Sequence, residues 1–229
     1  MHIEQAETID QIRSQYAKRI LNGANEKYTA HPIYQDYIIE ERERIYLQYI
    51  NQLRIPKSEI KLMEIGAGLG LNLPVFEKNG LQWENLYANE LLEERVNQMR
   101  ASLPTPNIFA GDALDLPFEN KFDVVFQSTV FTSVLSEPFR ISLARKMLKM
   151  LKDDGFILWY DFIYDNPNNP DVRKANRGDV LKYFPQAKQI DFHSVTLAPP
   201  IGRRIGHAYG WMNALFPFLR SHLIAIIYK

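Results

Sequence analysis

Residues 62–70 read Leu-Met-Glu-Ile-Gly-Ala-Gly-Leu-Gly, an apolar run that passes directly into three glycines spaced by single residues. The run predicts a short strand over residues 61–65 and a turn over residues 66–70. A helix is expected over residues 72–78, because Pro74 falls in its first turn, where proline is tolerated. Glycine permits positive φ and lets a ligand approach the backbone closely. The stretch therefore predicts a strand–turn–helix unit whose turn faces a ligand.

Short apolar segments alternate with helical ones on both sides of this unit. Strands of about five residues separated by helices predict βαβ units and a mainly parallel, doubly wound α/β sheet. Residues 9–20 and 35–53 show helical spacing, which predicts an N-terminal helical cap over residues 1–57 and the sheet domain over residues 58–229. Further strands are expected over residues 85–89, 107–110, 122–127, 156–162, 190–197 and 223–228, helices over residues 91–103, 138–151, 177–184 and 209–215, and a turn at Asp153-Asp154-Gly155.

The cysteine content and the charge balance of the chain exclude several classes of protein. The 229 residues carry 27 basic and 27 acidic side chains and no cysteine. The absence of cysteine excludes a disulfide scaffold, a cysteine-ligated metal and a thiol nucleophile. A balanced charge argues against a dedicated nucleic-acid binder, which usually has a basic excess. No secretory signal and no apolar run of membrane-spanning length are present, so a soluble cytoplasmic protein is expected.

The charge is unevenly distributed along the chain. Residues 166–229 hold 9 basic and 3 acidic side chains, whereas residues 1–165 hold 18 basic and 24 acidic ones. Two interpretations stay open: a solvated surface whose imbalance arose by chance, or a C-terminal part that meets an anionic substrate.

Acidic residues lie at or just after the ends of three of the predicted strands, at the edge where an open α/β sheet binds ligands. Glu64 lies two residues before the first glycine, where a carboxylate suits a ligand ammonium. Glu90 ends the second strand and can accept hydrogen bonds from both hydroxyls of a ribose. Asp112 follows the third strand and can accept a hydrogen bond from an adenine amino group. Leu71 stands where the G-x-G-x-x-G motif needs its third glycine, which disfavours a dinucleotide.

In this order and spacing, these residues resemble the class I S-adenosylmethionine-dependent methyltransferases. The first motif of that family is similar to residues 64–70, its third to residues 111–118 and its fourth to residues 122–128, and Glu90 matches its acidic residue after the second strand. The resemblance implies a Rossmann-like sheet of seven strands with an antiparallel last strand. It also implies S-adenosylmethionine as the cofactor and S-adenosylhomocysteine as the product.

The same resemblance implies a set of cofactor-binding residues at the strand ends. Residues 127–129, Gln-Ser-Thr, depart from the small or histidine-containing sequence that is more frequent in the family. No metal site is predicted, because Asp161 and Asp165 are the only carboxylate pair near the end of the fifth strand. The expected cofactor-binding residues are Glu64, Gly66, Ala67, Gly68, Gly70, Glu90, Leu91, Asp112, Ala113, Gln127 and Ser128, with Tyr28 from the N-terminal part.

A narrower resemblance concerns the acceptor. Residues 159–162, 169–173 and 196–200, together with Arg203 and Arg204, are similar to methyltransferases encoded with bacterial polysaccharide and glycan biosynthesis enzymes. This likeness implies that the methyl group goes to a hydroxyl of a sugar or glycan precursor.

Candidate residues for that chemistry lie in several places. Asp161, near the end of the fifth strand, is the leading general base and His193 the second, because methylation of a hydroxyl is assisted by proton removal. Arg173, Arg203 and Arg204 suit an anionic group on the acceptor, since the guanidinium fork matches carboxylates and phosphates. His31, in the loop before the second helix, is expected over the cofactor and near the acceptor.

Other functions stay open at this point. The acceptor of an N- or O-methyltransferase can be another small metabolite, and a non-catalytic cofactor-binding protein can keep the same fold. A protein or nucleic-acid methyltransferase is a further alternative, and the neutral charge balance weakens its nucleic-acid version.

Overall fold

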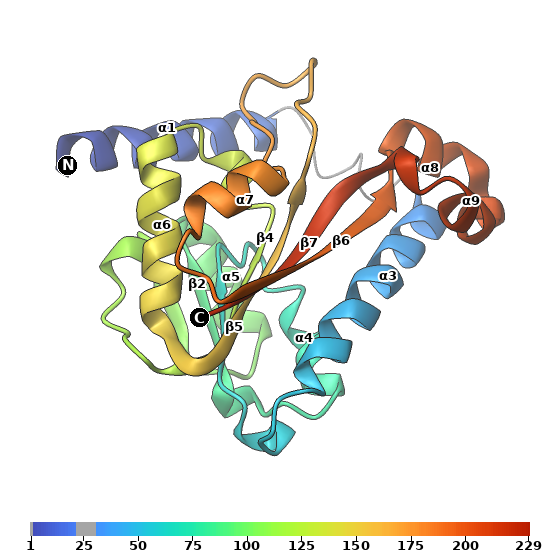
Figure 1. Ribbon diagram of the computed structural model, residues 1–229. Coiled ribbons are helices and arrows are strands. Elements are labelled where there is room, and N and C mark those ends of the chain that lie inside the picture. Colours follow the sequence, from blue (N-terminus) through green and yellow to red (C-terminus); the bar gives the residue numbers. More distant parts are fainter. Residues whose placement is uncertain (1, 22–30) are drawn as a thin grey trace.

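Seven strands form one sheet with helices on both faces in the computed structural model, which describes residues 2–21 and 31–229 (Figure 1). The order is β3-β2-β1-β4-β5-β7-β6, and β7 runs antiparallel to β5 and β6, whereas the other neighbouring strands run parallel. The predicted fold and its antiparallel last strand are therefore confirmed. The strands are β1 (Leu62–Ile65), β2 (Leu86–Glu90), β3 (Ile108–Ala110), β4 (Phe122–Ser128), β5 (Leu151–Phe162), β6 (Gln189–Leu197) and β7 (Arg220–Tyr228).

The helices cover the sheet in two layers (Figure 1). One face is covered by α1 (His2–Leu21), α6 (Glu137–Met150) and α7 (Arg177–Tyr183). The other is covered by α3 (Pro32–Ile50), α4 (Leu73–Lys78) and α5 (Glu93–Ser102). Two short helices, α8 (Pro199–Ile205) and α9 (Tyr209–Leu215), interrupt the β6–β7 hairpin and pack against the first half of α3.

Burial on both faces explains the apolar character of the central strands. Leu62 packs with the α3–α4–α5 layer and Met63 with the opposite layer, because successive side chains of a strand point to opposite faces. A parallel sheet covered on both sides therefore needs apolar residues at nearly every position. Glu64 is the exception in β1, and its carboxylate is buried on the α3 side beside the ends of the strands.

Two segments differ from the sequence-based expectations. The turn expected at Asp153-Asp154-Gly155 is wrong, because β5 already begins at Leu151 and reaches residue 156 through an irregular register with β4. Gly155 permits this path, since a Cβ there would lie 2.8 Å from the backbone oxygen of Asp123. Helix α8 was not among the predicted elements; Pro199 and Pro200 lie in its first turn, where proline is tolerated.

The N-terminal helices are present, and the second half of α3 packs on the sheet. Ile45 and Tyr46 of α3 are buried against α4 and the sheet. A domain boundary at residue 57 therefore stays a prediction. None of the described helices is long and apolar enough to cross a membrane.

Candidate functional site

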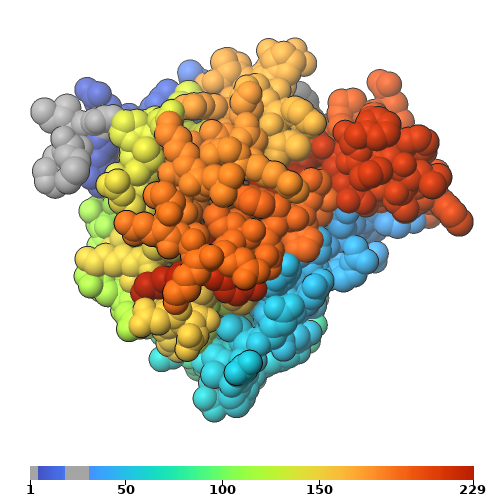
Figure 2. Space-filling view, viewed as in Figure 1, coloured from blue at the N-terminus to red at the C-terminus, as the bar shows by residue number. Residues whose placement is uncertain are grey.

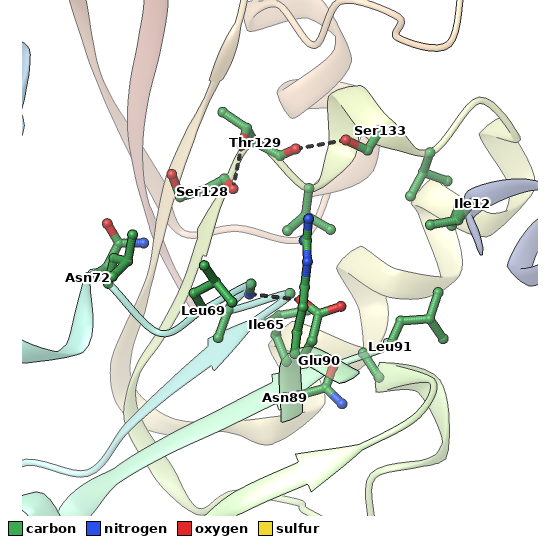
Figure 3. A pocket seen from close by; sticks show the side chains of 18 of the residues that line it. Ile12, Ile65, Leu69, Asn72, Asn89, Glu90, Leu91, Ser128, Thr129 and Ser133 are labelled. Atoms are coloured by element: carbon green, nitrogen blue, oxygen red, sulfur yellow. Dashed lines mark hydrogen bonds between the residues drawn. The ribbon is translucent and has the colours of Figure 1, made fainter. Parts of the chain in front are cut away.

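A cavity of about 490 Å³ lies at the carboxyl ends of β1, β2 and β4, and α1 and α3 complete its wall. This is the edge at which open α/β sheets bind ligands, and the volume is that of a small-molecule site. Figure 3 shows Glu90 between Leu69 and Leu91, with Ser128 and Thr129 across from it. In the same view Asn72 lies at one end of the pocket and Ile12 of α1 at the other.

The glycine turn forms the floor of this cavity. Gly66 and Gly68 both have positive φ, of 63° and 61°, and both line the cavity together with Ala67. A Cβ on Gly66 would lie 2.6 Å from Cγ2 of Val130, so the loop after β4 can approach only a glycine there. Gly70 does not line the cavity. A Cβ at that position would meet Leu103 at 2.5 Å, so its role in the structure is to let the turn pack on the end of α5.

Glu90 stands in the middle of the cavity and is tied to the turn. Its Oε2 accepts a hydrogen bond from the backbone N–H of Gly68 at 2.8 Å, and its Oε1 accepts one from the N–H of Leu92 at 3.0 Å. A carboxylate has about four lone-pair sites, so each oxygen keeps one for a ligand hydroxyl. The pair of ribose hydroxyls expected at Glu90 therefore fits the geometry.

Asp112 marks the end of the cavity near α1. Its Oδ1 accepts a hydrogen bond from the N–H of Leu114 at 2.9 Å, and its Oδ2 accepts one from Nε2 of Gln5 at 2.7 Å. The wall beside it is apolar, which suits a flat heterocycle held by one polar contact. Its members are Ile9, Ile12, Leu91, Ala113, Val134, Phe139 and Leu143.

The opposite end carries buried polar groups that lack partners. Oε1 of Glu64 accepts a hydrogen bond from Nδ2 of Asn72 at 2.6 Å, but its Oε2 is buried without a partner, as are Nε of Arg42 and the hydroxyl of Tyr46. Asn72, Arg42 and Tyr46 line the cavity, whereas Glu64 lies directly behind Asn72. Buried polar atoms are normally hydrogen-bonded, so this end is arranged to receive polar ligand groups.

The charges at this end are of both signs. Burial raises the pKa of Glu64 to about 8, although the hydrogen bond from Asn72 and the charge of Arg42 lower it. Burial works against the charge of Arg42, but Tyr46, Tyr160 and the carboxylates nearby raise its pKa, so it stays cationic. An ammonium near Glu64 and a carboxylate near Arg42 would satisfy both groups, and a methionine moiety carries that pair. The residues present therefore fit S-adenosylmethionine along the whole cavity: methionine at Arg42, ribose at Glu90 and adenine at Asp112.

The end of β4 and the residues after it form the wall across from Glu90. Ser128 and Thr129 line the cavity, and Thr129 has a φ of 59°, a conformation that β-branched residues rarely adopt. Its N–H donates to the carbonyl of Tyr160 at 2.8 Å, which holds this strained turn in place. Gln127 is fully buried beneath it, and its side chain donates to Asp161 and accepts from Val130 rather than facing the cavity.

The two candidate bases do not line the cavity. Asp161 has no exposed surface and accepts hydrogen bonds from Oγ1 of Thr132 at 2.7 Å and from Nε2 of Gln127 at 3.1 Å. Burial raises the pKa of Asp161 to about 7, even though these hydrogen bonds lower it. His193 lies on β6 in a separate groove, where its Nε2 is 2.8 Å from the hydroxyl of Tyr49.

The expected acceptor-binding residues also lie outside the cavity wall. His31 precedes α3, and its carbonyl accepts from the N–H of Gln35 in the first turn. Arg173 forms an ion pair with Glu137 at 3.2 Å. Arg203 is half-buried beside Tyr34, and Arg204 is exposed on α8. Tyr28 lies outside the described residues.

Of the expected cofactor-binding residues, eight line the cavity together: Gly66, Ala67, Gly68, Glu90, Leu91, Asp112, Ala113 and Ser128. Sequence reasoning missed Arg42 and Glu43, which reach the cavity from α3, and Asn72 after the turn. Helical spacing of Gln35, Ile39, Arg42, Glu43 and Tyr46 along one face was the available signal, but the cluster of charges at residues 40–44 reads as solvent-exposed.

Comparison with known proteins agrees with this geometry. Residues 63–159 match the family described as a methyltransferase domain. No curated protein matches the chain significantly.

Solved methyltransferase structures share the fold at low sequence identity. A protein from Thermotoga maritima, described as a possible histamine N-methyltransferase, is similar with a TM-score of 0.63 at 13% identity, over 90% of this chain and 96% of that one. An S-adenosylmethionine-dependent methyltransferase from Archaeoglobus fulgidus gives 0.56 at 16% identity, over 84% of this chain and 94% of that one. One from Mesorhizobium loti gives 0.56 at 15% identity, over 81% and 97%. At these identities the likeness is one of fold.

The family match covers the glycine turn, Glu90, Asp112 and β4, which are the elements that build the cavity. Residues 63–159, less than half of the chain, therefore match a methyltransferase domain, and they include the elements that line most of a cavity whose residues fit S-adenosylmethionine.

Proposed function

We propose that the enzyme methylates a hydroxyl of a small acceptor, and that this acceptor is a sugar or a glycan precursor. The observation that carries the proposal is the position of Glu43. Three carboxylates line the cavity in the described part of the chain, namely Glu43, Glu90 and Asp112. Glu90 and Asp112 suit the ribose and the adenine of the donor, so Glu43, on α3, is left for the acceptor.

A hydroxyl acceptor needs a group that removes its proton. S-adenosylmethionine supplies a methyl group already activated on a sulfonium, so the chain has to align the acceptor oxygen with it and take the hydroxyl proton. As the new O–C bond forms and the S–C bond breaks, Glu43 accepts that proton. A general base in this position typically contributes about 10²–10⁴-fold in rate. Glu43 is preferred to Asp161 and His193 because neither of those lines the cavity.

The wall across from Glu90 supports a polyhydroxylated acceptor. Ser128, Thr129 and Ser133 line it, and Ser133 and Thr129 donate their own protons to carbonyl oxygens of this turn. Their hydroxyl oxygens keep lone pairs for acceptor hydroxyls. The narrower resemblance of residues 159–162, 169–173 and 196–200, with Arg203 and Arg204, to glycan methyltransferases points to the same class.

The experiment is a measurement of S-adenosylhomocysteine release with two acceptor panels. One panel holds nucleotide sugars and free glycans, and the other holds small primary and secondary amines. We expect turnover with a member of the first panel, and a Glu43→Gln variant whose kcat falls by about 10²-fold or more while its affinity for S-adenosylhomocysteine is retained.

Glu40→Gln is the matched control, because Glu40 is exposed on α3 and faces a different groove. Turnover with amines alone, or equal losses in both variants, would reject the proposed acceptor and the role of Glu43.

A further inference from the structure

The segment between β6 and β7, residues 198–219, projects from the rest of the protein. Figure 1 places α8 and α9 at the far end of the β6–β7 hairpin, beside the beginning of α3. Figure 2 shows the same segment, in red, projecting from one side of the molecule. No residue between α8 and α9 lines the methyl-donor cavity, so this segment needs an explanation of its own.

Large apolar side chains are exposed on this projection. Trp211 is 77% exposed, Leu215 66% and Phe218 73%, and Phe216 lies between the last two at 36%. Trp211 and Leu215 are four residues apart on α9 and therefore lie on one side of it. Soluble monomers rarely leave contiguous apolar patches of this kind without a binding role.

The exposure is not a sign of a loosely held segment. Tyr209 is buried and stacks on Tyr37 with ring centroids 5.0 Å apart. Nδ2 of Asn213 donates to Glu41 at 2.7 Å, and Nε of Arg220 donates to Oδ1 of Asn213 at 2.8 Å. These contacts fix one side of α9 to α3 and β7, so the opposite side is presented outward by a rigid support.

The charge of the segment is of one sign. Asp191 is the last acidic residue of the sequence, and every formally charged side chain after it is basic: Arg203, Arg204, Arg220 and Lys229. Arg204 is exposed on α8, and His207 is exposed one turn before Trp211. The acidic groups of the neighbouring helix point elsewhere: Glu41 keeps its charge but accepts hydrogen bonds from Asn213 and Tyr209 on the inner side of α9, and Glu40 lines the groove between α3 and β6. Asp36 is exposed on the first turns of α3.

We propose that this surface, made of Arg204, His207, Trp211, Leu215, Phe216 and Phe218 and here named the docking face, binds the surface of an anionic phospholipid bilayer. Aromatic and aliphatic side chains with adjacent cations are the combination that lies in a membrane interface: the rings enter the headgroup and acyl boundary, and the arginine stays among the phosphates. A second copy of the chain is a poorer occupant. A two-fold contact places the same patch on both sides, so it would bring Arg204 and His207 of both copies into one interface while the docking face offers no acidic residue to pair with them.

The test is binding of the full chain to vesicles of phosphatidylcholine with and without phosphatidylglycerol, measured by flotation. We expect binding only to the anionic vesicles, weakened by salt. A Trp211→Ser, Phe218→Ser double variant should lose at least about tenfold in partitioning, because binding scales with buried apolar area. Arg204→Gln should lose roughly fivefold.

Matched controls separate the docking face from other exposed groups. Tyr164→Ser with Leu181→Ser removes apolar side chains that are 61% and 55% exposed elsewhere, and Lys57→Gln removes an exposed cation of η1 (Lys57–Glu59). Both controls should bind like the wild type. Each variant is first shown to bind S-adenosylhomocysteine and to unfold at the wild-type temperature, so that a folding defect is not read as lost docking.

Phosphatidylcholine with brominated acyl chains, included in the anionic vesicles, reports direct contact. It should quench the fluorescence of Trp211, and a Trp211→Phe variant should still bind while that quenching disappears. Absence of binding to anionic vesicles, equal binding by the double variant, or a dimer in solution that the double variant converts to monomer would each overturn the proposal.

Discussion

Oε2 of Glu90, at the end of β2, accepts a hydrogen bond from the backbone N–H of Gly68, in the turn after β1, over 2.8 Å. The bond joins the two sequence features that first suggested a nucleoside ligand. It orients the carboxylate toward the cavity while its remaining lone pairs stay available. The hydrogen bond itself is structural, and we expect the carboxylate to bind ligand as well, so substitution of Glu90 tests both roles.

Replacing Glu90 should weaken binding of S-adenosylhomocysteine. Hydrogen bonds to a charged group contribute about 1.5–3 kcal/mol each, so Glu90→Gln should raise the Kd by about 10- to 100-fold and Glu90→Ala by more. Titration calorimetry measures this directly. Glu84→Gln, an exposed glutamate of η2 (Trp83–Asn85), is the control. Wild-type affinity in Glu90→Ala would remove Glu90 from the ribose role.

Arg42 should matter only for ligands that carry a methionine carboxylate. Arg42→Gln should raise the Kd for S-adenosylhomocysteine by about 10- to 100-fold, the cost of losing a charge-assisted pair. Binding of 5′-methylthioadenosine, which lacks the amino-acid group, should be unchanged. Arg44→Gln is the control, because Arg44 is exposed on the same helix and lies in the other groove. Equal losses for both ligands would indicate that Arg42 supports the cavity wall instead.

Glu64 should make the ligand-free protein less stable as the pH rises. Burial raises the pKa of Glu64 from 4.5 to about 8, so the folded state holds a proton that the unfolded state releases between these values. This contribution to stability is present below pH 4.5 and is lost as the pH approaches 8. Glu64→Gln cannot ionise and should flatten the upper part of the pH profile by about 1–3 kcal/mol. Urea unfolding at several pH values measures the difference, and identical profiles would contradict it.

Asp161 should prove to be important for stability rather than for proton transfer. Asp161→Asn places an amide where Thr132 and Gln127 both donate, so a buried donor loses its acceptor at a cost of about 1–3 kcal/mol. We expect a lower Tm, unchanged affinity for S-adenosylhomocysteine, and a kcat within about tenfold of the wild type. Asp165→Asn is the exposed control. A loss of kcat beyond 10²-fold at wild-type stability would restore Asp161 as the general base.

The sequence predicted the sheet and the donor side of the cavity because both depend on local patterns. A strand, a glycine turn and acids at strand ends are contiguous features, and parallel strands bring their carboxyl ends to one edge. Gly66, Glu90 and Asp112 were therefore found from spacing alone and lie together. Gly70 and Gln127 are close in sequence to cavity residues but serve packing, which spacing does not distinguish.

The acceptor side was not predictable in the same way. Arg42 and Glu43 reach the cavity only because α3 crosses the sheet at a particular angle, which follows from packing of Ile45 and Tyr46 rather than from any motif. Asp161 is the opposite case: it was predicted as a site residue but does not line the cavity. Its place at the end of β5 suggests a cleft residue, but hydrogen bonds from Gln127 and Thr132 turn its carboxylate into the interior.

The hydrogen bond from Gln5 to Asp112 bears on how fast the product is released from the cavity. Helix α1 makes two contacts across the cavity. The side chain of Gln5 donates a hydrogen bond to Asp112, and the guanidinium of Arg95 lies 4.5 Å from the ring centroid of Tyr16. An adenine amino group has to share the Asp112 carboxylate with Gln5 or displace it. We therefore expect α1, and not the sheet alone, to influence how fast the nucleoside leaves the cavity.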